Sequence, residues 1–131
     1  MAATLYDDSQ WPLVRIRLPA ALDTAELVVS LDYIDALFLR GERFAVLIDV
    51  RDAPPLTAPQ RKLVAERSDA MYARYPTRLA GMALILSSAI QRGVVTAIQW
   101  LVKGGFPTRV FARLVDAEIW LRAQLDVPGS R

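Results

Sequence analysis

Polar side chains that could do chemistry gather where two apolar stretches of the sequence end. The stretches are residues 44–50 and 79–86, and the side chains at or beyond their ends are Asp49, Arg51, Asp52, Thr57, Ser87, Ser88 and Arg92. A phosphate on a hydroxyl at a helix start would lie near the positive end of the helix dipole. It would also add about two negative charges to a surface that faces a partner. The sequence therefore offers Thr57 as a candidate phosphorylation switch.

The simpler interpretation of Thr57 and Ser88 is structural. Each is followed three residues later by a glutamine, Gln60 and Gln91, which is the pattern of a helix N-cap. A cap of this kind is worth about 1 kcal/mol and needs no further role. Both interpretations place the two hydroxyls at helix starts.

The residue types argue against catalysis. The sequence has no His and no Cys, which removes thiol nucleophiles, the usual zinc ligands and the usual proton shuttle at neutral pH. Asp49 and Asp52 flank Arg51, which would keep both acids ionised and unsuited to general acid catalysis. No glycine-rich phosphate loop is present. We therefore predict a protein that is not an enzyme and uses no cofactor or metal.

Asp49 also has the position of a phospho-acceptor or metal ligand in a receiver domain. A receiver needs an acidic pair after its first strand and a lysine after its last. Here Asp7 and Asp8 precede the first core strand, and Lys103 ends a helix. Ordinary solvated acids, one of them paired with Arg51, are the favoured interpretation.

Length and composition fit one domain over residues 1–126, with a tail at 127–131 that we predict to be disordered. The 131 residues are 53% hydrophobic and carry a net charge of only +2, too little to drive nucleic-acid binding. No apolar run approaches the roughly 20 residues that span a bilayer, and no signal peptide is evident, so we predict a cytoplasmic protein. The mean hydropathy of +0.24 is high and suggests apolar surface covered by a partner or a second copy.

Strands and helices alternate along the sequence. Residues 13–18 alternate apolar and charged side chains, as in a half-exposed strand, and a short strand at 3–6 could pair with them as a hairpin. A helix is predicted from Asp23 to Gly41, a buried strand over 44–50, and a helix from Thr57 to Tyr75. A second buried strand over 79–86, a helix from Ser88 to Gly104, a strand over 108–112 and a helix over 116–125 follow.

Strands joined by helices of a dozen or more residues require crossover connections. The predicted class is therefore α/β, with a mainly parallel sheet of four to five strands and about four helices packed on it. In such sheets functional groups gather beyond the carboxyl ends of the strands. The seven polar residues at the ends of the two apolar stretches are thus predicted to form one partner-facing edge.

The helix that begins at Ser88 has apolar side chains over a wider part of its surface than the single apolar stripe usual for a helix packed on a sheet. Its apolar side chains are Ile90, Val94, Val95, Ala97, Ile98, Trp100, Leu101 and Val102. One explanation is a helix packed between the sheet and a neighbouring helix. The other is an exposed interface, with Val94 on it and Trp100 as an anchor, that would form a homodimer.

Several stretches together resemble a known fold. They are RFAVLIDVRD at 43–52, TAPQR at 57–61, QRG at 91–93 with WLV at 100–102, VF at 110–111 and AEIWL at 117–121. With the order of the elements, they resemble the STAS fold of bacterial anti-sigma-factor antagonists, and in detail the small bacterial STAS/SEC14-like proteins. The resemblance covers roughly residues 10–125. Its motifs are specific for the fold and say little about chemistry.

The resemblance implies a non-enzymatic regulatory module that docks a protein partner, in the better-known members a kinase-type regulator. Phosphorylation of a serine in an Asp-Ser-Ser-Gly-like motif controls docking in those members. Thr57 is the hydroxyl at the matching place, within Leu56-Thr57-Ala58-Pro59, and the glycine is absent. The lipid-binding part of the family name implies the alternative, a small apolar ligand held between helices and sheet.

Overall fold

A single five-stranded sheet forms the centre of the computed structural model, which describes residues 4–101 and 105–127, with the backbone alone for 99–101. The strands lie in the order β1-β2-β3-β4-β5, and β1 runs antiparallel to β2 while β2 to β5 are parallel. The strands are β1 (Leu5–Gln10), β2 (Leu13–Arg17), β3 (Phe44–Asp49), β4 (Leu79–Ile85) and β5 (Thr108–Phe111). The predicted α/β class with a mainly parallel sheet is confirmed.

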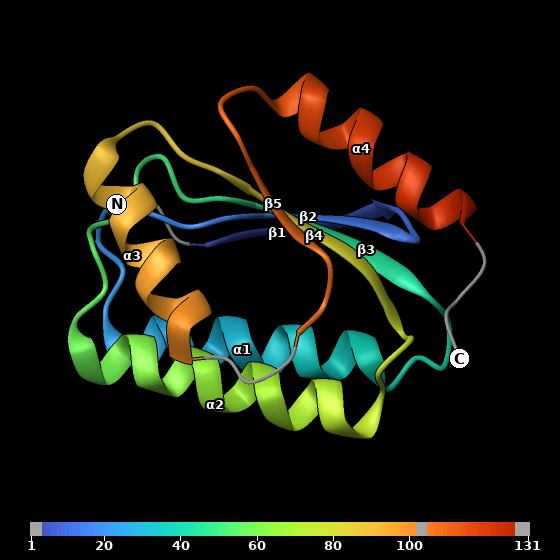
Figure 1. Cartoon of the computed structure of the whole chain (residues 1–131), viewed down its shortest axis with the longest axis horizontal. Coiled ribbons are helices and arrows are strands. Elements are labelled where there is room, and N and C mark those ends of the chain that lie inside the picture. The colour runs from blue at the N-terminus through green and yellow to red at the C-terminus, as the bar shows by residue number, and fades with distance from the viewer. Residues whose placement is uncertain (1–3, 102–104, 128–131) are drawn as a thin grey trace.

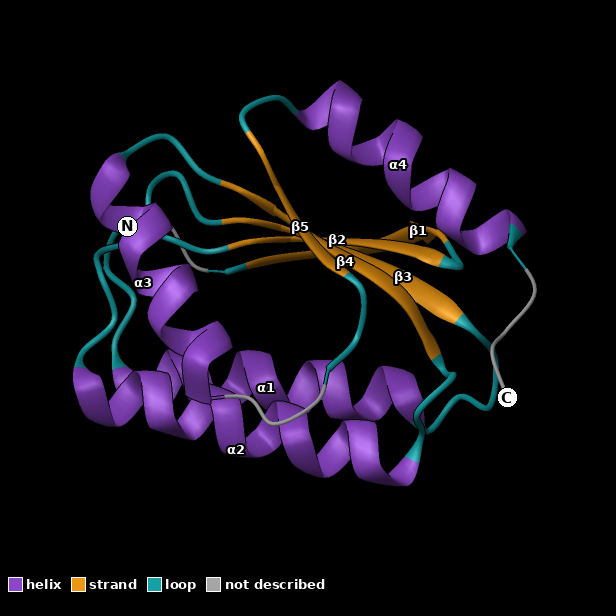
Figure 2. Ribbon diagram, in the orientation of Figure 1, coloured by secondary structure: helices purple, strands orange, loops and turns teal. Residues whose placement is uncertain are grey.

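The helices divide unequally between the two faces of the sheet (Figure 1). They are α1 (Thr24–Phe38), α2 (Ala58–Arg74), α3 (Ala89–Leu101) and α4 (Leu114–Asp126). The three crossovers from β2 to β5 all step in the same direction, so right-handed connections place α1, α2 and α3 on one side. Helix α4 follows the last strand and packs alone on the other side, against β3, β4 and β5 (Figure 2).

Local signals in the sequence set the helix boundaries. The Asp23 carboxylate accepts a hydrogen bond from the Glu26 backbone N–H at 2.8 Å, which caps α1. Gly41, just beyond the C-terminal end of α1, has φ of 85°, a conformation that glycine adopts without strain. Thr57 and Gln60 form a complete capping box at the start of α2.

Alternate residues of the strands build a separate core on each face. On the α4 face the core includes Leu47, Ile85, Ala117 and Leu121. On the other face Val14, Ile16, Phe38 and Phe44 pack with Val46. This second core lies toward one end of the sheet, where Phe38 contacts Phe44 edge-on with ring centroids 5.0 Å apart.

Two elements begin two residues away from their predicted starts. The first strand covers Leu5–Gln10 rather than residues 3–6, because a polar run can serve as an edge strand that pairs on one side and faces solvent. Helix α4 begins at Leu114, two residues before the predicted start, which places Asp116 in its first turn. The predicted tail covers residues 127–131, of which 128–131 lie outside the described residues. The predicted end of α3 at Gly104 and the side chain of Trp100 lie outside them too.

Candidate functional site

The carboxyl end of β3 carries a nearly buried ion pair. The Asp49 side chain is 8% exposed and accepts two hydrogen bonds from the Arg51 guanidinium, from Nε at 3.0 Å and from Nη2 at 2.8 Å. The Arg51 backbone N–H donates a third at 3.1 Å. Burial raises the pKa of Asp49, but the hydrogen bonds from Arg51 outweigh it and hold that pKa below its ordinary value. Of the two acids that the sequence predicts Arg51 to keep ionised, Asp49 binds the Arg51 guanidinium, whereas Asp52 pairs with Arg17.

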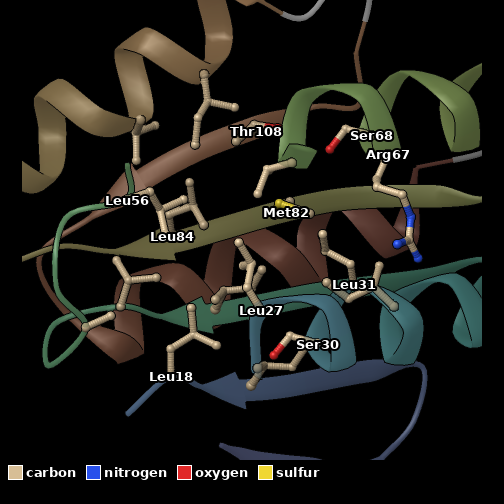
Figure 3. A pocket seen from close by; sticks show the side chains of 18 of the residues that line it. Leu18, Leu27, Ser30, Leu31, Leu56, Arg67, Ser68, Met82, Leu84 and Thr108 are labelled. Atoms are coloured by element: carbon tan, nitrogen blue, oxygen red, sulfur yellow. The ribbon is translucent and has the colours of Figure 1, made fainter. Parts of the chain in front are cut away.

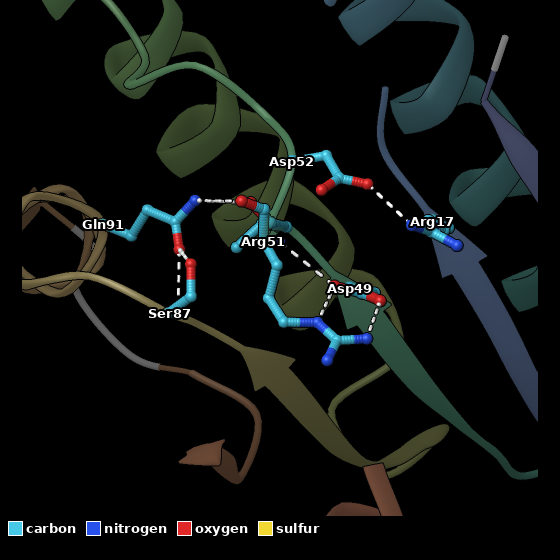
Figure 4. A network of polar contacts seen from close by, with 7 residues as sticks. Arg17, Asp49, Arg51, Asp52, Ser87 and Gln91 are labelled. Carbon is cyan, nitrogen blue, oxygen red and sulfur yellow. Dashed lines mark hydrogen bonds and ion pairs between the residues drawn. The ribbon is translucent and has the colours of Figure 1, made fainter. Parts of the chain in front are cut away.

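The same edge holds a second ion pair and a buried amide (Figure 4). Asp52 pairs with Arg17, at the end of β2, with Nη2 and Oδ2 2.7 Å apart. The side-chain amide of Gln91 donates to the carbonyl oxygens of Val50 at 2.7 Å and Arg51 at 3.1 Å. Its oxygen accepts from the backbone N–H of Ser87, at 2.9 Å. Gln91 therefore ties the start of α3 to the loop that follows β3.

The two candidate hydroxyls lie at helix starts, as the sequence indicates. Thr57 is exposed, and its hydroxyl accepts from the Gln60 backbone N–H at 3.3 Å. Ser88 is exposed and accepts in the same way from the Gln91 backbone N–H at 3.2 Å. Ser87 and Arg92 are exposed close to Ser88, and the neighbouring Ile90 is 66% exposed. The structure thus gathers Asp49, Arg51, Asp52, Ser87 and Ser88 at one edge, which we call the polar edge.

An apolar cavity of about 440 Å³ lies between the sheet and the three helices α1, α2 and α3. The strands contribute Ile16, Ile48, Met82 and Leu84, and the helices contribute further apolar residues such as Leu27, Leu31, Val64 and Met71. Figure 3 shows side chains from strands and helices pointing into this common space, with Leu18 and Leu56 on one side and Arg67 on the other. A pocket of this size and lining is typical of small-molecule sites.

The position of α2 accounts for this cavity. Ala65 is the one buried residue of α2, so this helix does not pack closely against the strands through a continuous row of buried apolar side chains. Polar contacts hold α2 to α1 instead: Gln60 donates to the Thr24 hydroxyl at 2.9 Å, and Arg67 pairs with Asp32 and Asp35. The apolar side chains on this face of α2, Val64 and Met71, line the cavity without filling it.

The cavity and the polar edge share a wall. Val50, Ala53, Pro54, Pro55 and Leu56, from the loop after β3, line the cavity together with Gln91. The same loop carries Arg51 and Asp52 on the edge. Val94, a predicted interface residue, is half-buried and lines the cavity as well. Part of the wide apolar stripe on α3 is therefore explained by the cavity.

Sequence reasoning missed three arginines that fix this arrangement. Arg67 bridges α1 and α2. Arg43 donates to the carbonyls of Gln124 and Leu125 in the last turn of α4 and to that of Val127 just beyond it, the last at 2.6 Å. Arg78 donates to the carbonyl of Phe38 at 2.5 Å. Two of these arginines, at positions 43 and 78, stand directly before an apolar strand, and this is the one sequence feature that could have drawn attention to them. The hydrogen-bond partners of these arginines are remote in sequence, so the sequence does not predict which residues they contact.

Comparisons with known proteins identify the fold. Two crystal structures superpose on nearly the whole chain with a TM-score of 0.58 each. One is an uncharacterized protein of the DUF3478 family with a SpoIIAA-like fold from Shewanella loihica, 18% identical over 91% of this chain and 92% of its own. The other is an anti-sigma factor antagonist from Mycobacterium paratuberculosis, 19% identical over 92% and 93%. The fold is therefore STAS-like, as the sequence predicts.

Neither a protein-family model nor a curated protein matches this sequence. Within the described residues, no helix is long and apolar enough to cross a membrane.

Proposed function

We propose that this protein is a non-enzymatic binding module that holds a small apolar ligand in the cavity between the sheet and helices α1 to α3. The observation that carries the proposal is the cavity itself, about 440 Å³ and lined mainly by aliphatic side chains. Transfer of an apolar molecule from water into such a space is favourable by roughly 25 cal/mol per Å² of apolar surface removed from water. The STAS-like fold needs no catalytic group for this role.

A titration with the neutral dye Nile red tests the proposal. Leu84 points into the cavity, so Leu84→Trp should fill it and weaken dye binding about tenfold or more. Ile119→Trp places the same ring on α4, where the side chain is 65% exposed on the far face of the sheet, and should bind like the wild type. Circular dichroism confirms that both variants fold.

Equal binding by the wild type and both variants would place the dye elsewhere and reject the cavity. If Leu84→Trp does not fold, Leu56→Trp, in the loop that lines the cavity, replaces it. Native mass spectrometry of protein purified from its host complements the titration. A retained small molecule supports the proposal, and a clean apo mass counts against it.

A second candidate function is docking of a partner protein at the polar edge. It is supported by exposed Ser87, Ser88 and Arg92 close in sequence to the exposed Ile90, and by the exposed Thr57 at the start of α2. A structural neighbour described as an anti-sigma factor antagonist also supports it. In this proposal phosphorylation of Thr57 would break docking by adding negative charge. The partner would be a kinase-type regulator and the protein a cytoplasmic signalling module.

Thr57→Glu tests the docking proposal. The variant should retain the wild-type circular dichroism spectrum and lose a partner that the wild type and Thr57→Ser both capture. Unaltered capture by Thr57→Glu would remove Thr57 from the proposal. Self-association through α3 is a separate proposal: size-exclusion chromatography should show a dimer that Trp100→Ala disrupts, and a monomeric wild type would end it.

A further inference from the structure

The charged groups that line the cavity are already paired with each other. Within the described residues these groups are Asp35 and Arg67. The Arg67 guanidinium donates from Nε to an Asp35 oxygen at 3.2 Å and from Nη2 to the same oxygen at 2.5 Å. Nη2 also donates to Asp32 at 2.7 Å. One cation therefore faces two carboxylates, and this group of three carries a net charge of −1.

Among the described residues, three other polar side chains at the cavity wall have partners inside the protein, and the fourth, Ser68, is uncharged. The Ser30 hydroxyl lies 3.0 Å from the Tyr6 hydroxyl and donates to the Glu26 carbonyl at 3.1 Å. The Gln91 amide is bound to the loop after β3. The Thr108 hydroxyl donates to the carbonyl of Phe106 at 3.0 Å. None of these groups supplies a positive charge to a ligand.

We propose that the cavity selects neutral apolar molecules and rejects long-chain carboxylates such as fatty-acid anions. This inference rests on the first proposed function and names its ligand class. A carboxylate that enters the cavity loses its water, at a cost that only a charged partner repays. The cation at the wall, Arg67, is engaged by two acids, and Asp35 would repel the incoming anion. A neutral head group meets no such penalty.

Three compounds with one chain length test the inference: dodecanol, methyl dodecanoate and the dodecanoate anion. Each compound is titrated against the complex of Nile red with the 131-residue protein at neutral pH, below its own micelle or solubility limit. Dodecanol and methyl dodecanoate should displace the dye at concentrations about tenfold lower than dodecanoate needs. The ester separates the effect of charge from that of head-group size.

Asp35→Asn sharpens the test. It makes the group of three neutral, so affinity for dodecanoate should rise several-fold while affinity for dodecanol stays unchanged. Asp116→Asn is the matched control, because it changes the net charge equally but lies on α4, behind the sheet. Its ratio of dodecanol to dodecanoate affinity should equal that of the wild type.

The outcomes separate the two proposals. If none of the three compounds displaces the dye, the ligand-binding function fails, and the inference fails with it. If dodecanoate binds as tightly as dodecanol, or more tightly, the cavity binds ligands but the inference is wrong. If Asp35→Asn does not fold, the wild-type comparison of dodecanoate with its methyl ester decides alone.

Discussion

The pairing of Asp49 with Arg51 shows how a single residue can hold a charge at the end of a buried strand. A carboxyl whose pKa is lower in the folded state stabilises the fold above the unfolded-state pKa of about 3.9. For Asp49 this contribution is lost as the pH falls through its lowered folded-state pKa. The stabilisation is therefore present at neutral pH and disappears in acid.

Replacing Arg51 should expose this dependence. In Arg51→Met the nearly buried Asp49 carboxylate keeps only the backbone donor, so the free energy of unfolding at neutral pH should fall by about 1–2 kcal/mol, allowing for the partly exposed guanidinium. The difference from the wild type should shrink below about pH 3.9, where the carboxyl takes up a proton. Urea unfolding across this pH range measures both effects.

Arg17→Met serves as the control for that experiment. It breaks the pair with Asp52, whose side chain is 51% exposed, so the loss should be less than about 1 kcal/mol. A loss as large in Arg17→Met as in Arg51→Met would show that burial of Asp49 does not set the energy.

At the scale of elements, two arginines join helix ends to strand starts. Arg43 precedes β3 and holds the last carbonyls of α4, while Arg78 precedes β4 and holds the carbonyl of Phe38 at the end of α1. Helix ends leave carbonyl groups without partners inside the helix, and a cation there also complements the helix dipole. Each arginine therefore fixes a helix to the sheet at the edge opposite the polar edge.

Arg43→Met should loosen α4 without unfolding the sheet. Loss of the hydrogen bonds to Gln124, Leu125 and Val127 should lower the free energy of unfolding by about 1–2 kcal/mol. Amide hydrogen exchange in the last turn of α4 should accelerate more than exchange in β3. Arg122→Met is the control, since its hydrogen bond to Gln10 is exposed and its loss should change neither quantity appreciably. Uniform acceleration in Arg43→Met would mean that Arg43 supports the whole fold instead.

At the scale of the whole molecule, the two faces of the sheet differ in how closely helices pack on them. The face under α4 is closely packed: a Cβ on Gly81 would lie 3.3 Å from atoms of Trp120 and Gln124. The face under α1, α2 and α3 keeps a cavity of about 440 Å³. A ligand that binds the folded state alone stabilises it by mass action. Binding of a ligand in the cavity should therefore raise the free energy of unfolding of the whole protein.

Dodecanol should raise the denaturation midpoint of the wild type in a concentration-dependent way. At about 100 times its dissociation constant the expected gain is about 2.7 kcal/mol. Leu84→Trp, with the cavity filled, should gain little, and Ile119→Trp should gain as much as the wild type. An equal gain in all three proteins would indicate a non-specific effect of the alcohol on unfolding.

Much of the fold could be predicted because its signals are local. The run 44–50 is apolar enough to be a strand buried on both faces, and Thr57 with Gln60 marks a helix start. The polar edge followed from these elements, since the ends of parallel strands meet. The boundaries that were missed, at β1 and α4, lie where polar residues occupy exposed positions and pattern says little.

The sequence by itself determined the α/β class, the order of the elements and the hydroxyls at the helix starts. Only the tertiary structure decided that the space beneath α2 is a cavity and that Arg67 pairs with both Asp32 and Asp35. The physical reason is that helix and strand signals arise within a few residues of the chain. A cavity depends on how far a helix stands from the sheet, which remote side chains set together.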